Sequence, residues 1–486
     1  MSSLCTPNTW QRVGQQVLDP GIDKAAVLLP DDSVFICGGH RSLLSGNSSA
    51  WRLRDGQASW IGRMTTMRAG HAACVLDDGR VLIVGGQEMG GQAHASAELY
   101  DPRAGSFTAT GPMVQARVYP CATRLAGGKV LVTGGLDANG VPRSSAELYD
   151  PATGRFASVT QPMKAARGRH TSTLLRDGRV LLVSGTSAEW YDAGSGSFVA
   201  TQGPTIARTN HAAALLHDGR VLIAGGYNGS TVGNQAFEEI WNDRTGQIRH
   251  VGPAGASSSP AVTVGTGPFD ITRFGLTLTT LSDGRVLVVG GSPWNDPLQT
   301  DPSISGATRL FDPATETFTT LGGGGELRRA WHQALLLPTG QVVVIGGVAA
   351  KDEDFFPGTA AIWCPDPAPV ALHVDFAGSG RGTVDIAPGN VHATAAVSHW
   401  FPHGTAVQLT AKALPVRITS PTEPLSLPGR PPRPTLRANR FAGWSGDATG
   451  TSPDTSVTMT AERRVCATFD ETAVQPIEPR PPKIPV

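Results

Sequence analysis

The chain carries little charge of either sign. Charged residues make up 16% of its 486 residues, and 40 lysines and arginines balance 40 aspartates and glutamates. Proteins that bind nucleic acid or an anionic membrane surface electrostatically usually have a clear basic excess. The composition therefore predicts neither kind of partner.

Cysteine is also scarce. The six cysteines show no CxxC motif and no paired spacing. Cys37, Cys74 and Cys121 fall in apolar segments that we expect to be strands, where a free thiol packs like a small hydrophobic side chain. We therefore expect buried thiols at these positions.

Long apolar segments are absent as well. No apolar run reaches eighteen residues, so we expect no membrane-spanning helix. Residues Met1 to Cys5 contain no apolar stretch of the kind that a secretory signal needs. The sequence therefore does not determine the localisation.

What the sequence does have is a repeated unit. A turn followed seven residues later by a strand-ending Gly-Gly doublet recurs along the chain, with Ser184-Gly185 in place of the doublet in one of the seven copies. These glycines are Gly38, Gly85, Gly134, Gly185, Gly225, Gly290 and Gly346. Self-similarity at about fifty residues is typical of a propeller built from four-stranded blades. Seven copies predict seven blades and an all-β fold.

Each part of the repeat has a physical reason. The segment after the turn, such as Val81 to Val84, is apolar and β-branched without alternation, which favours a strand buried on both faces. Asp-Gly before it is a hairpin signal. A third strand carries an aromatic residue, as at Tyr100 and Tyr149, and the following Asp-Pro ends it. A short fourth strand begins near a phenylalanine such as Phe107.

The glycine doublets, the spaced aromatics and the Arg-x-x-His segments before each turn resemble the kelch repeat over roughly residues 8 to 365. The resemblance implies a seven-bladed kelch-type β-propeller at 1–365, similar to the central domain of galactose oxidase. The seventh repeat ends near Trp363 without a fourth strand, whereas the segment around Trp10 resembles the outer-strand segment around Trp60. We therefore expect the N-terminal segment to complete the last blade and close the ring.

A second domain is predicted at 366–470. Alternating strands there are separated by glycine turns, as in Gly382-Thr-Val and Gly404-Thr-Ala-Val-Gln-Leu-Thr-Ala411. Together with Gly-Trp444-Ser-Gly-Asp, they resemble the divergent bacterial repeat domain related to internalin B-repeats. The resemblance implies a non-catalytic module and an extracellular or cell-envelope location. A Pro-rich insertion spans 415–440, and the Pro-rich tail 471–486 is predicted to be disordered.

Arginines recur ten residues before the turn in six repeats, and they are our first candidates for ligand binding. Because strands alternate in direction, we expect these residues on the loop face that surrounds the channel mouth. Guanidinium groups suit carboxylates, and the kelch resemblance implies acidic peptide ligands at comparable positions. The alternative is that a residue present in most blades serves blade structure. The candidates are Arg68, Arg117, Arg208, Arg273 and Arg329.

Non-repeated residues near the same face are further candidates. Tyr227 directly follows a glycine doublet, and Trp294 and Asp296 lie in a long loop at 292–306. Long loops in a compact domain are often functional, so these side chains predict one side of a pocket for a sugar or a peptide. A solvated, variable loop cluster is the alternative.

Histidines follow four of the repeated arginines, at His71, His170, His211 and His332. A ring of histidines could bind metal. Pro120 and Leu276 occupy equivalent positions in other repeats, and adjacent blades are too far apart for ligand geometry. We expect structural histidines and no metal site.

Kelch propellers also include copper-radical oxidases similar to galactose oxidase, whose chemistry uses two tyrosines and two histidines at one copper. This chain has five tyrosines, three of them in the repeated third strand, which leaves Tyr119 and Tyr227 and no Tyr-His pair. The sequence thus favours a non-catalytic protein over an enzyme.

The function predicted from sequence is a monomeric binding scaffold without a cofactor, whose propeller mouth recognises a carbohydrate or an acidic peptide or protein segment. One alternative is a copper-radical oxidase acting on carbohydrate alcohols or aldehydes. Another is a structural surface protein that binds through the outer blades or the C-terminal module.

Overall fold

The computed structural model describes residues 7–13, 21–42, 45–88, 91–226, 238–251, 274–292, 308–321, 327–349, 360–367, 370–387, 391–414, 417–419 and 435–474. Within these ranges the chain forms strands and turns, and no helix is long and apolar enough to cross a membrane. It divides into two compact units, Met1–Asp366 and Pro367–Val486.

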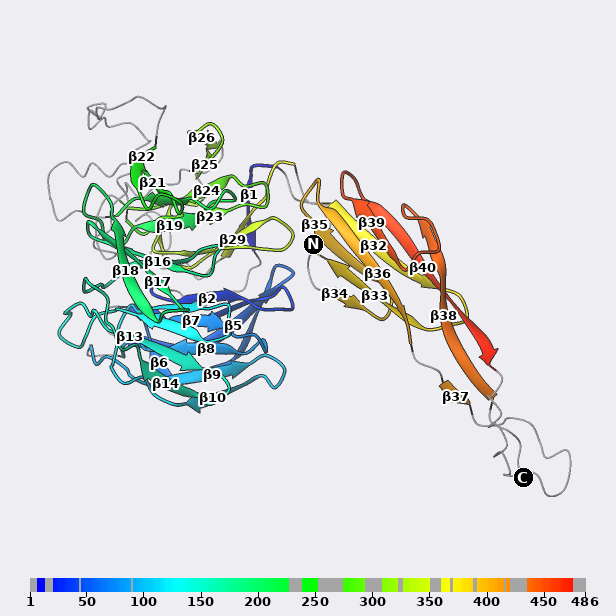
Figure 1. Ribbon diagram of the computed structural model, residues 1–486, viewed down its shortest axis with the longest axis horizontal. Coiled ribbons are helices and arrows are strands. Elements are labelled where there is room, and N and C mark those ends of the chain that lie inside the picture. Colours follow the sequence, from blue (N-terminus) through cyan, green and yellow to red (C-terminus); the bar gives the residue numbers. More distant parts are fainter. Residues whose placement is uncertain are drawn as a thin grey trace, which may run out of the picture. The chain divides into compact units, whose positions relative to one another are not determined.

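The first unit is a propeller of seven antiparallel sheets, as the repeats predict (Figure 1). Blade 1 contains β2 (Ala25–Leu28), β3 (Val34–Cys37), β5 (Ser45–Arg54) and β6 (Gln57–Arg68), with β4 (His40–Ser42) paired to β5. Blade 2 contains β7 (Ala72–Val75), β8 (Val81–Val84), β9 (Ala97–Asp101) and β10 (Ser106–Thr110). Blade 3 contains β11 (Cys121–Arg124), β12 (Val130–Thr133), β13 (Ala146–Asp150) and β14 (Arg155–Ser158).

The remaining blades repeat this order. Blade 4 contains β15 (Thr171–Leu174), β16 (Val180–Ser184), β17 (Ser187–Asp192) and β18 (Ser197–Gln202). Blade 5 contains β19 (Ala212–Leu215), β20 (Val221–Ala224), β21 (Glu239–Trp241) and β22 (Ile248–His250). Blade 6 contains β23 (Thr277–Thr280), β24 (Val286–Val289), β25 (Thr308–Asp312) and β26 (Thr317–Leu321). Blade 7 contains β28 (Gln333–Leu336), β29 (Val342–Ile345), β31 (Ala360–Trp363) and β1 (Trp10–Val13).

The first strands of the blades surround the channel. Each contacts the first strand of the next blade, and β28 of blade 7 contacts β2 of blade 1, so the ring is complete. The second strand of every blade is buried along its whole length, as its unbroken apolar sequence predicts. The third-strand aromatics pack on the fourth strand, for example Tyr149 on Phe156 with ring centroids 4.8 Å apart.

The ring closes as predicted. Strand β1 pairs antiparallel with β31, placing Trp10 opposite Trp363. The indole N–H of Trp10 also donates to Thr308 Oγ1 of blade 6 at 2.9 Å. Cys364, directly after β31, is disulfide-bonded, which the cysteine spacing did not reveal. Cys37, Cys74 and Cys121 are free thiols; Cys37 and Cys74 are buried as expected, whereas Cys121 is partly buried.

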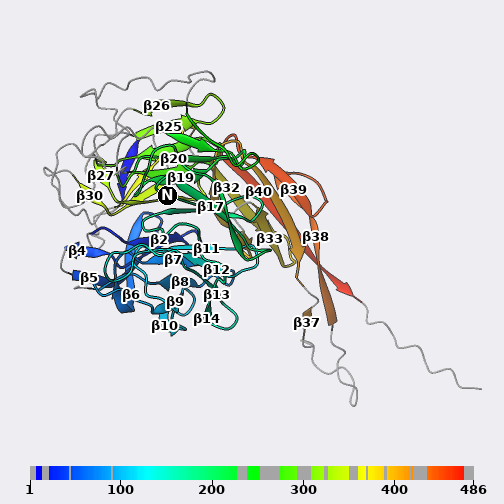
Figure 2. The same cartoon turned by 60° about the vertical axis from the view of Figure 1, so that its left-hand side comes forward.

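A short two-stranded sheet pairs β27 (Arg329–Ala330), which comes shortly before β28, with β30 (Val348–Ala349), which comes shortly after β29 (both labelled in Figure 2). It belongs to a series of similar pairings between the segment before a first strand and the segment after a second strand. In other blades this pairing is reduced to single bridges, such as Ala69 with Gln87 and Val118 with Leu136. These bridges fix the backbone around the channel mouth.

The second unit consists of two sheets, with strand orders β35-β32-β40-β38-β37 and β34-β33-β36-β39. The strands are β32 (Val370–Ala377), β33 (Gly382–Ala387), β34 (Val391–Ala393), β35 (Val397–Phe401), β36 (Ala406–Ala413), β37 (Arg417–Thr419), β38 (Thr435–Gly446), β39 (Asp454–Thr458) and β40 (Arg463–Val474). Both sheets contribute to one core, which includes Leu372, Leu409, Trp444 and Phe469. Strand β40 continues to Val474, so the first four residues of the predicted disordered tail 471–486 are strand, and the rest of the tail lies outside the described residues. The resemblance of this unit to the bacterial repeat domain stays a prediction.

Candidate functional site

The repeated arginines lie inside the blades, away from the accessible surface. Arg68, Arg117 and Arg208 have exposed fractions of 0%, and Arg329 has 3%. Arg68 Nε lies 2.9 Å from Glu98 Oε1, and Arg208 Nη2 lies 2.7 Å from Glu239 Oε2. The expectation that these guanidinium groups surround an open mouth is therefore corrected, because a ligand in the channel cannot reach them.

Their hydrogen bonds explain why the arginine recurs. In blade 3, Arg117 donates through Nη2 to Glu147 at 3.0 Å and through Nη1 to the Gly134 carbonyl at 2.8 Å. Glu147 also accepts from the backbone N–H groups of Val114 and Gln115. The pair thus joins the segment before the first strand to the second and third strands. This contact corresponds to the alternative that the repeated arginines serve blade structure.

The same arginines also join neighbouring blades. The carbonyl of Arg117 accepts from the N–H of Gly86 in the preceding blade at 2.8 Å. A β-carbon on Gly85 would stand 2.6 Å from that carbonyl oxygen, and Gly85 has a φ of 70°. The first glycine of the doublet is therefore needed both for its backbone conformation and for the close approach of the next blade.

The four repeated histidines are structural as well. Their Nε2 atoms lie within hydrogen-bond distance of the preceding blade, for example His170 with Thr133 Oγ1 at 2.8 Å and His332 with Thr277 Oγ1 at 2.8 Å. Burial, with a contribution from nearby arginines, lowers the pKa of each imidazole to about 3. The four are His71, His170, His211 and His332. They are neutral at neutral pH.

Four sequence candidates cannot be placed. Arg273, Tyr227, Trp294 and Asp296 lie outside the described residues. Their part in ligand binding stays a prediction, and the site below is built from other side chains.

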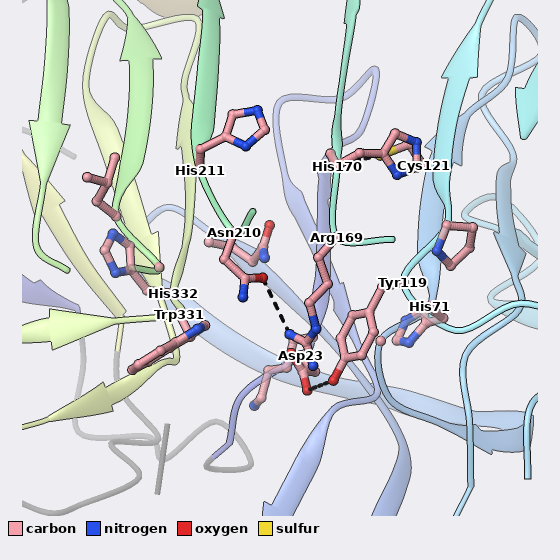
Figure 3. Close-up of a pocket in the computed structure, with 16 residues that line it drawn as sticks. Asp23, His71, Tyr119, Cys121, Arg169, His170, Asn210, His211, Trp331 and His332 are labelled. Atoms are coloured by element: carbon pink, nitrogen blue, oxygen red, sulfur yellow. Dashed lines mark hydrogen bonds between the residues drawn. The ribbon is translucent and has the colours of Figure 1, made fainter. Parts of the chain in front are cut away.

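The structure instead brings together one residue from each blade at the channel mouth. In each repeat it stands two positions after the arginine, or after Gly21 in blade 1. We call this set the mouth ring: Asp23, Gly70, Tyr119, Arg169, Asn210, Gly275 and Trp331. All seven have a positive φ, between 51° and 63°. All seven line one cavity of about 280 Å³ (Figure 3).

Backbone hydrogen bonds run along the mouth ring. Tyr119 N–H donates to the Gly70 carbonyl at 2.7 Å, and Gly70 N–H donates to the Asp23 carbonyl at 3.1 Å. Asn210 and Trp331 donate in the same way to the carbonyls of Arg169 and Gly275. The left-handed conformation turns each peptide toward its neighbour, so the ring is held by its backbone while its side chains remain variable.

Two glycines make room for two aromatic rings. A β-carbon on Gly70 would stand 2.7 Å from Cε1 of Tyr119, and one on Gly275 would stand 2.8 Å from Cγ of Trp331. Each aromatic side chain therefore lies over the glycine of the preceding blade. The mouth gains two aromatic surfaces that are only partly buried.

Polar groups converge beside Tyr119. Its hydroxyl donates to Asp23 Oδ2 at 2.7 Å, and the guanidinium carbon of Arg169 lies 3.7 Å from the centre of its ring (Figure 3). Burial and the nearby Asp23 raise the pKa of the Tyr119 hydroxyl. Arg169 Nη1 also donates to Asn210 Oδ1 over a long 3.5 Å. The mouth thus offers a carboxylate, an amide and a guanidinium close to an aromatic face.

The mouth ring also has a signal in the sequence, although the repeated arginines are the more obvious pattern. Two positions lie between the repeated arginine and the residue that is usually histidine, both differ from blade to blade, and the second is the mouth-ring position. Variable side chains on a recurring backbone are what a ligand site in a repeat protein requires.

Comparisons with known proteins agree with this architecture. A family model described as "Kelch motif" matches residues 67–114. This chain folds as a kelch-type propeller. The propeller's matched segment includes Arg68, Gly85, Gly86 and Glu98, which form the contacts between and within blades described above.

A solved structure titled "Novel fungal alcohol oxidase with catalytic diversity among the AA5 family, in complex with copper" is similar in fold. Its TM-score is 0.60 at 17% identity, covering 94% of this chain and 89% of that one. At this identity the similarity concerns the fold alone. No curated protein matches the sequence.

The similar structure is named as a complex with copper, so the described residues are compared with what a copper site requires. Among the residues that the structure describes, no group of three or more His, Cys, Asp or Glu side chains is arranged to hold a metal ion. The Nε2 atoms of the four repeated histidines lie against threonine or cysteine side chains of the preceding blade. The described residues therefore do not fit a copper centre, and we derive no reaction through one.

Proposed function

We propose that the protein is a non-catalytic binding scaffold whose mouth ring recognises a carbohydrate. The observation that carries this proposal is the mouth ring itself. Seven blades each present one residue on one recurring backbone conformation, five of them with different side chains and two of them glycine, around a cavity large enough for a single sugar residue. Binding sites for small ligands combine such concavity with a few well-placed polar groups.

The chemistry of the ring suits a sugar. The partly buried ring of Trp331 offers an apolar face on which the C–H groups of a pyranose can stack, and the ring of Tyr119, one face of which is covered by Arg169, adds apolar contact beside it. Asp23 can accept hydrogen bonds from hydroxyl groups, and Asn210 can both donate and accept them. These groups lie on different blades, so a sugar ring would be held from several sides.

The burial of the arginines weakens the acidic-peptide alternative. Among the described residues that line the cavity, the cations are Lys24 and Arg169 and the carboxylate is Asp23. The histidines are neutral because their pKa is about 3. This small net positive charge would attract a peptide segment with several carboxylates only weakly. It is sufficient for a sugar that carries at most one negative charge.

A glycan-binding assay tests the proposal. Isothermal titration of the full chain against neutral and acidic oligosaccharides should identify a ligand. Trp331→Ala should then weaken its binding about tenfold or more, the usual effect of removing a central aromatic contact. Trp60→Ala is the matched control, because Trp60 is exposed on an outer strand. Saccharide binding that is unchanged in Trp331→Ala, or absent altogether, would contradict the mouth assignment and favour the outer blades or the C-terminal unit.

The copper-oxidase alternative rests on the fold neighbour. It predicts stoichiometric copper in protein purified after copper loading, and hydrogen peroxide production with carbohydrate alcohols or aldehydes. Copper analysis and a peroxidase-coupled assay decide it, because a scaffold would show neither.

An extracellular or cell-envelope location is also a proposal. It rests on the resemblance of the C-terminal unit to bacterial repeat modules. The disulfide at Cys364 supports it, since structural disulfides persist mainly in oxidising compartments.

A further inference from the structure

Arg169 differs from the repeated arginines of the blades. Two residues earlier, Arg167 is fully buried and lies 2.7 Å from Glu189. Arg169 is partly exposed in the mouth cavity, and no carboxylate of the described residues lies within 4.0 Å of its nitrogens. One arginine is therefore paired inside the blade, and the next faces the cavity without an acidic partner among these residues.

The contacts that Arg169 does make hold it in place without neutralising it. Its guanidinium lies 3.7 Å from the centre of the Tyr119 ring and also interacts with the Tyr119 hydroxyl, and its Nη1 donates to Asn210 Oδ1 over 3.5 Å. Stacking on an aromatic ring orients the guanidinium plane and leaves its edge accessible. A guanidinium has five N–H donors, so most of them remain available to a ligand.

Asp23 is the acidic side chain in the same cavity, but it is already engaged. Its Oδ2 accepts from the Tyr119 hydroxyl at 2.7 Å and lies 3.9 Å from His40 Nε2. Besides Lys24, the described lining of the cavity therefore contains one held carboxylate and one separate, oriented guanidinium.

We infer that the ligand of the mouth ring is an acidic saccharide bearing one carboxylate per residue, a uronic acid, with the carboxylate on Arg169. A planar carboxylate accepts two parallel hydrogen bonds from one guanidinium edge, which gives both affinity and orientation. The sugar ring would then lie against the aromatic surfaces while Asp23 and Asn210 reach its hydroxyl groups. This inference rests on the proposed function and specifies its ligand class.

The test compares each uronic acid with its neutral counterpart on the full-length protein. Isothermal titration would use oligomers of galacturonate and glucuronate beside oligomers of galactose and glucose. We expect the matching acidic oligomer to bind at least tenfold more tightly than its neutral form. Its affinity should fall as salt is raised from 50 to 500 mM, because the added contact is ionic.

Two variants separate the roles of charge and stacking. Arg169→Gln should lower the affinity for the acidic oligomer at least tenfold more than the affinity for the neutral one and so remove the acidic preference, whereas Trp331→Ala should weaken both by similar factors. Arg155→Gln is the matched control, because Arg155 is exposed on the outer strand β14. Circular dichroism and melting curves would confirm that each variant is folded.

Each other outcome overturns the inference in a distinguishable way. Equal affinity of the native protein for acidic and neutral oligomers would remove the role of Arg169 but leave the carbohydrate proposal standing. Arg169-dependent binding of an oligoglutamate peptide, without saccharide binding, would replace the sugar by an acidic protein segment. Absence of saccharide binding would end both proposals.

Discussion

Trp331 lies directly against Gly275. A β-carbon at Gly275 would stand 2.6 Å from the backbone nitrogen of Trp331, and this nitrogen donates to the Gly275 carbonyl at 2.8 Å. Blades 6 and 7 can approach each other in this way because Gly275 has no side chain. The contact that makes an aromatic surface available at the mouth is therefore also a contact between blades.

Gly275→Ala should destabilise the propeller. An alanine would have to adopt a φ of 63°, which costs about 1–2 kcal/mol, and would also overlap backbone atoms that cannot move aside easily. Gly140→Ala is a suitable control, because Gly140 has a φ of 77° with no atom within 4 Å of an added β-carbon. Urea denaturation should show a larger loss of unfolding free energy for Gly275→Ala. Equal losses would mean that the blade contact contributes nothing.

Removing one partner of a buried ion pair should be costly. Arg117→Ala leaves Glu147 charged and buried, and we expect it to lower the free energy of unfolding by about 3–5 kcal/mol. Arg80→Ala breaks a partly exposed pair with Asp78 and should cost less than about 1 kcal/mol. Denaturant titrations of both variants test this difference. A small effect of Arg117→Ala would reopen the possibility that the arginines are maintained for ligand binding.

The free energy of unfolding should decrease as the pH is lowered, because of the four repeated histidines. Their pKa is about 3 in the folded protein but near 6.5 in the unfolded chain, so between these values the unfolded state binds more protons. Their contribution is complete above about pH 6.5 and decreases as the pH falls toward 3. His170→Gln should therefore reduce the loss of unfolding free energy between pH 7 and pH 5 by about 2 kcal/mol. His217→Gln, at an exposed histidine, is the control for the substitution itself.

The disulfide at Cys364 should stabilise the closed ring. Removing a native disulfide typically costs about 2–5 kcal/mol, so Cys364→Ser should lower the melting temperature. A reducing agent should lower it for the native protein and have no further effect on Cys364→Ser. Mass spectrometry of the unreduced, digested protein would identify the peptide joined to Cys364.

The fold was predictable because it is repetitive. The Gly doublets, the apolar second strands and the third-strand aromatics each reappear with the contacts that their chemistry predicts, as at Gly85 and Tyr149. Closure by the segment around Trp10 was also predictable, since the seventh repeat lacks a fourth strand of its own.

The site was less predictable, because a recurring arginine has the same sequence signal whether it faces a ligand or a carboxylate. The partner was present in the sequence as Glu98, Glu147, Glu189 and Glu239 of the third strands. Whether such a pair meets depends on how the segment before each first strand folds back over its own blade. That geometry, and the left-handed residue at which the chain turns into the mouth, could not be read from local patterns.

The pairing of Trp10 with Trp363 also concerns how the protein is made. Strand β1 is synthesised first but has its partner only when β31 emerges about 350 residues later, a separation that makes pairing entropically demanding and slow. Until then blade 7 has no outer strand, and each finished blade belongs to an open arc. We therefore expect the ring to fold cooperatively only after β31 has been synthesised. Pairing of β31 with β1 then completes blade 7 and closes the ring that contains the other six blades.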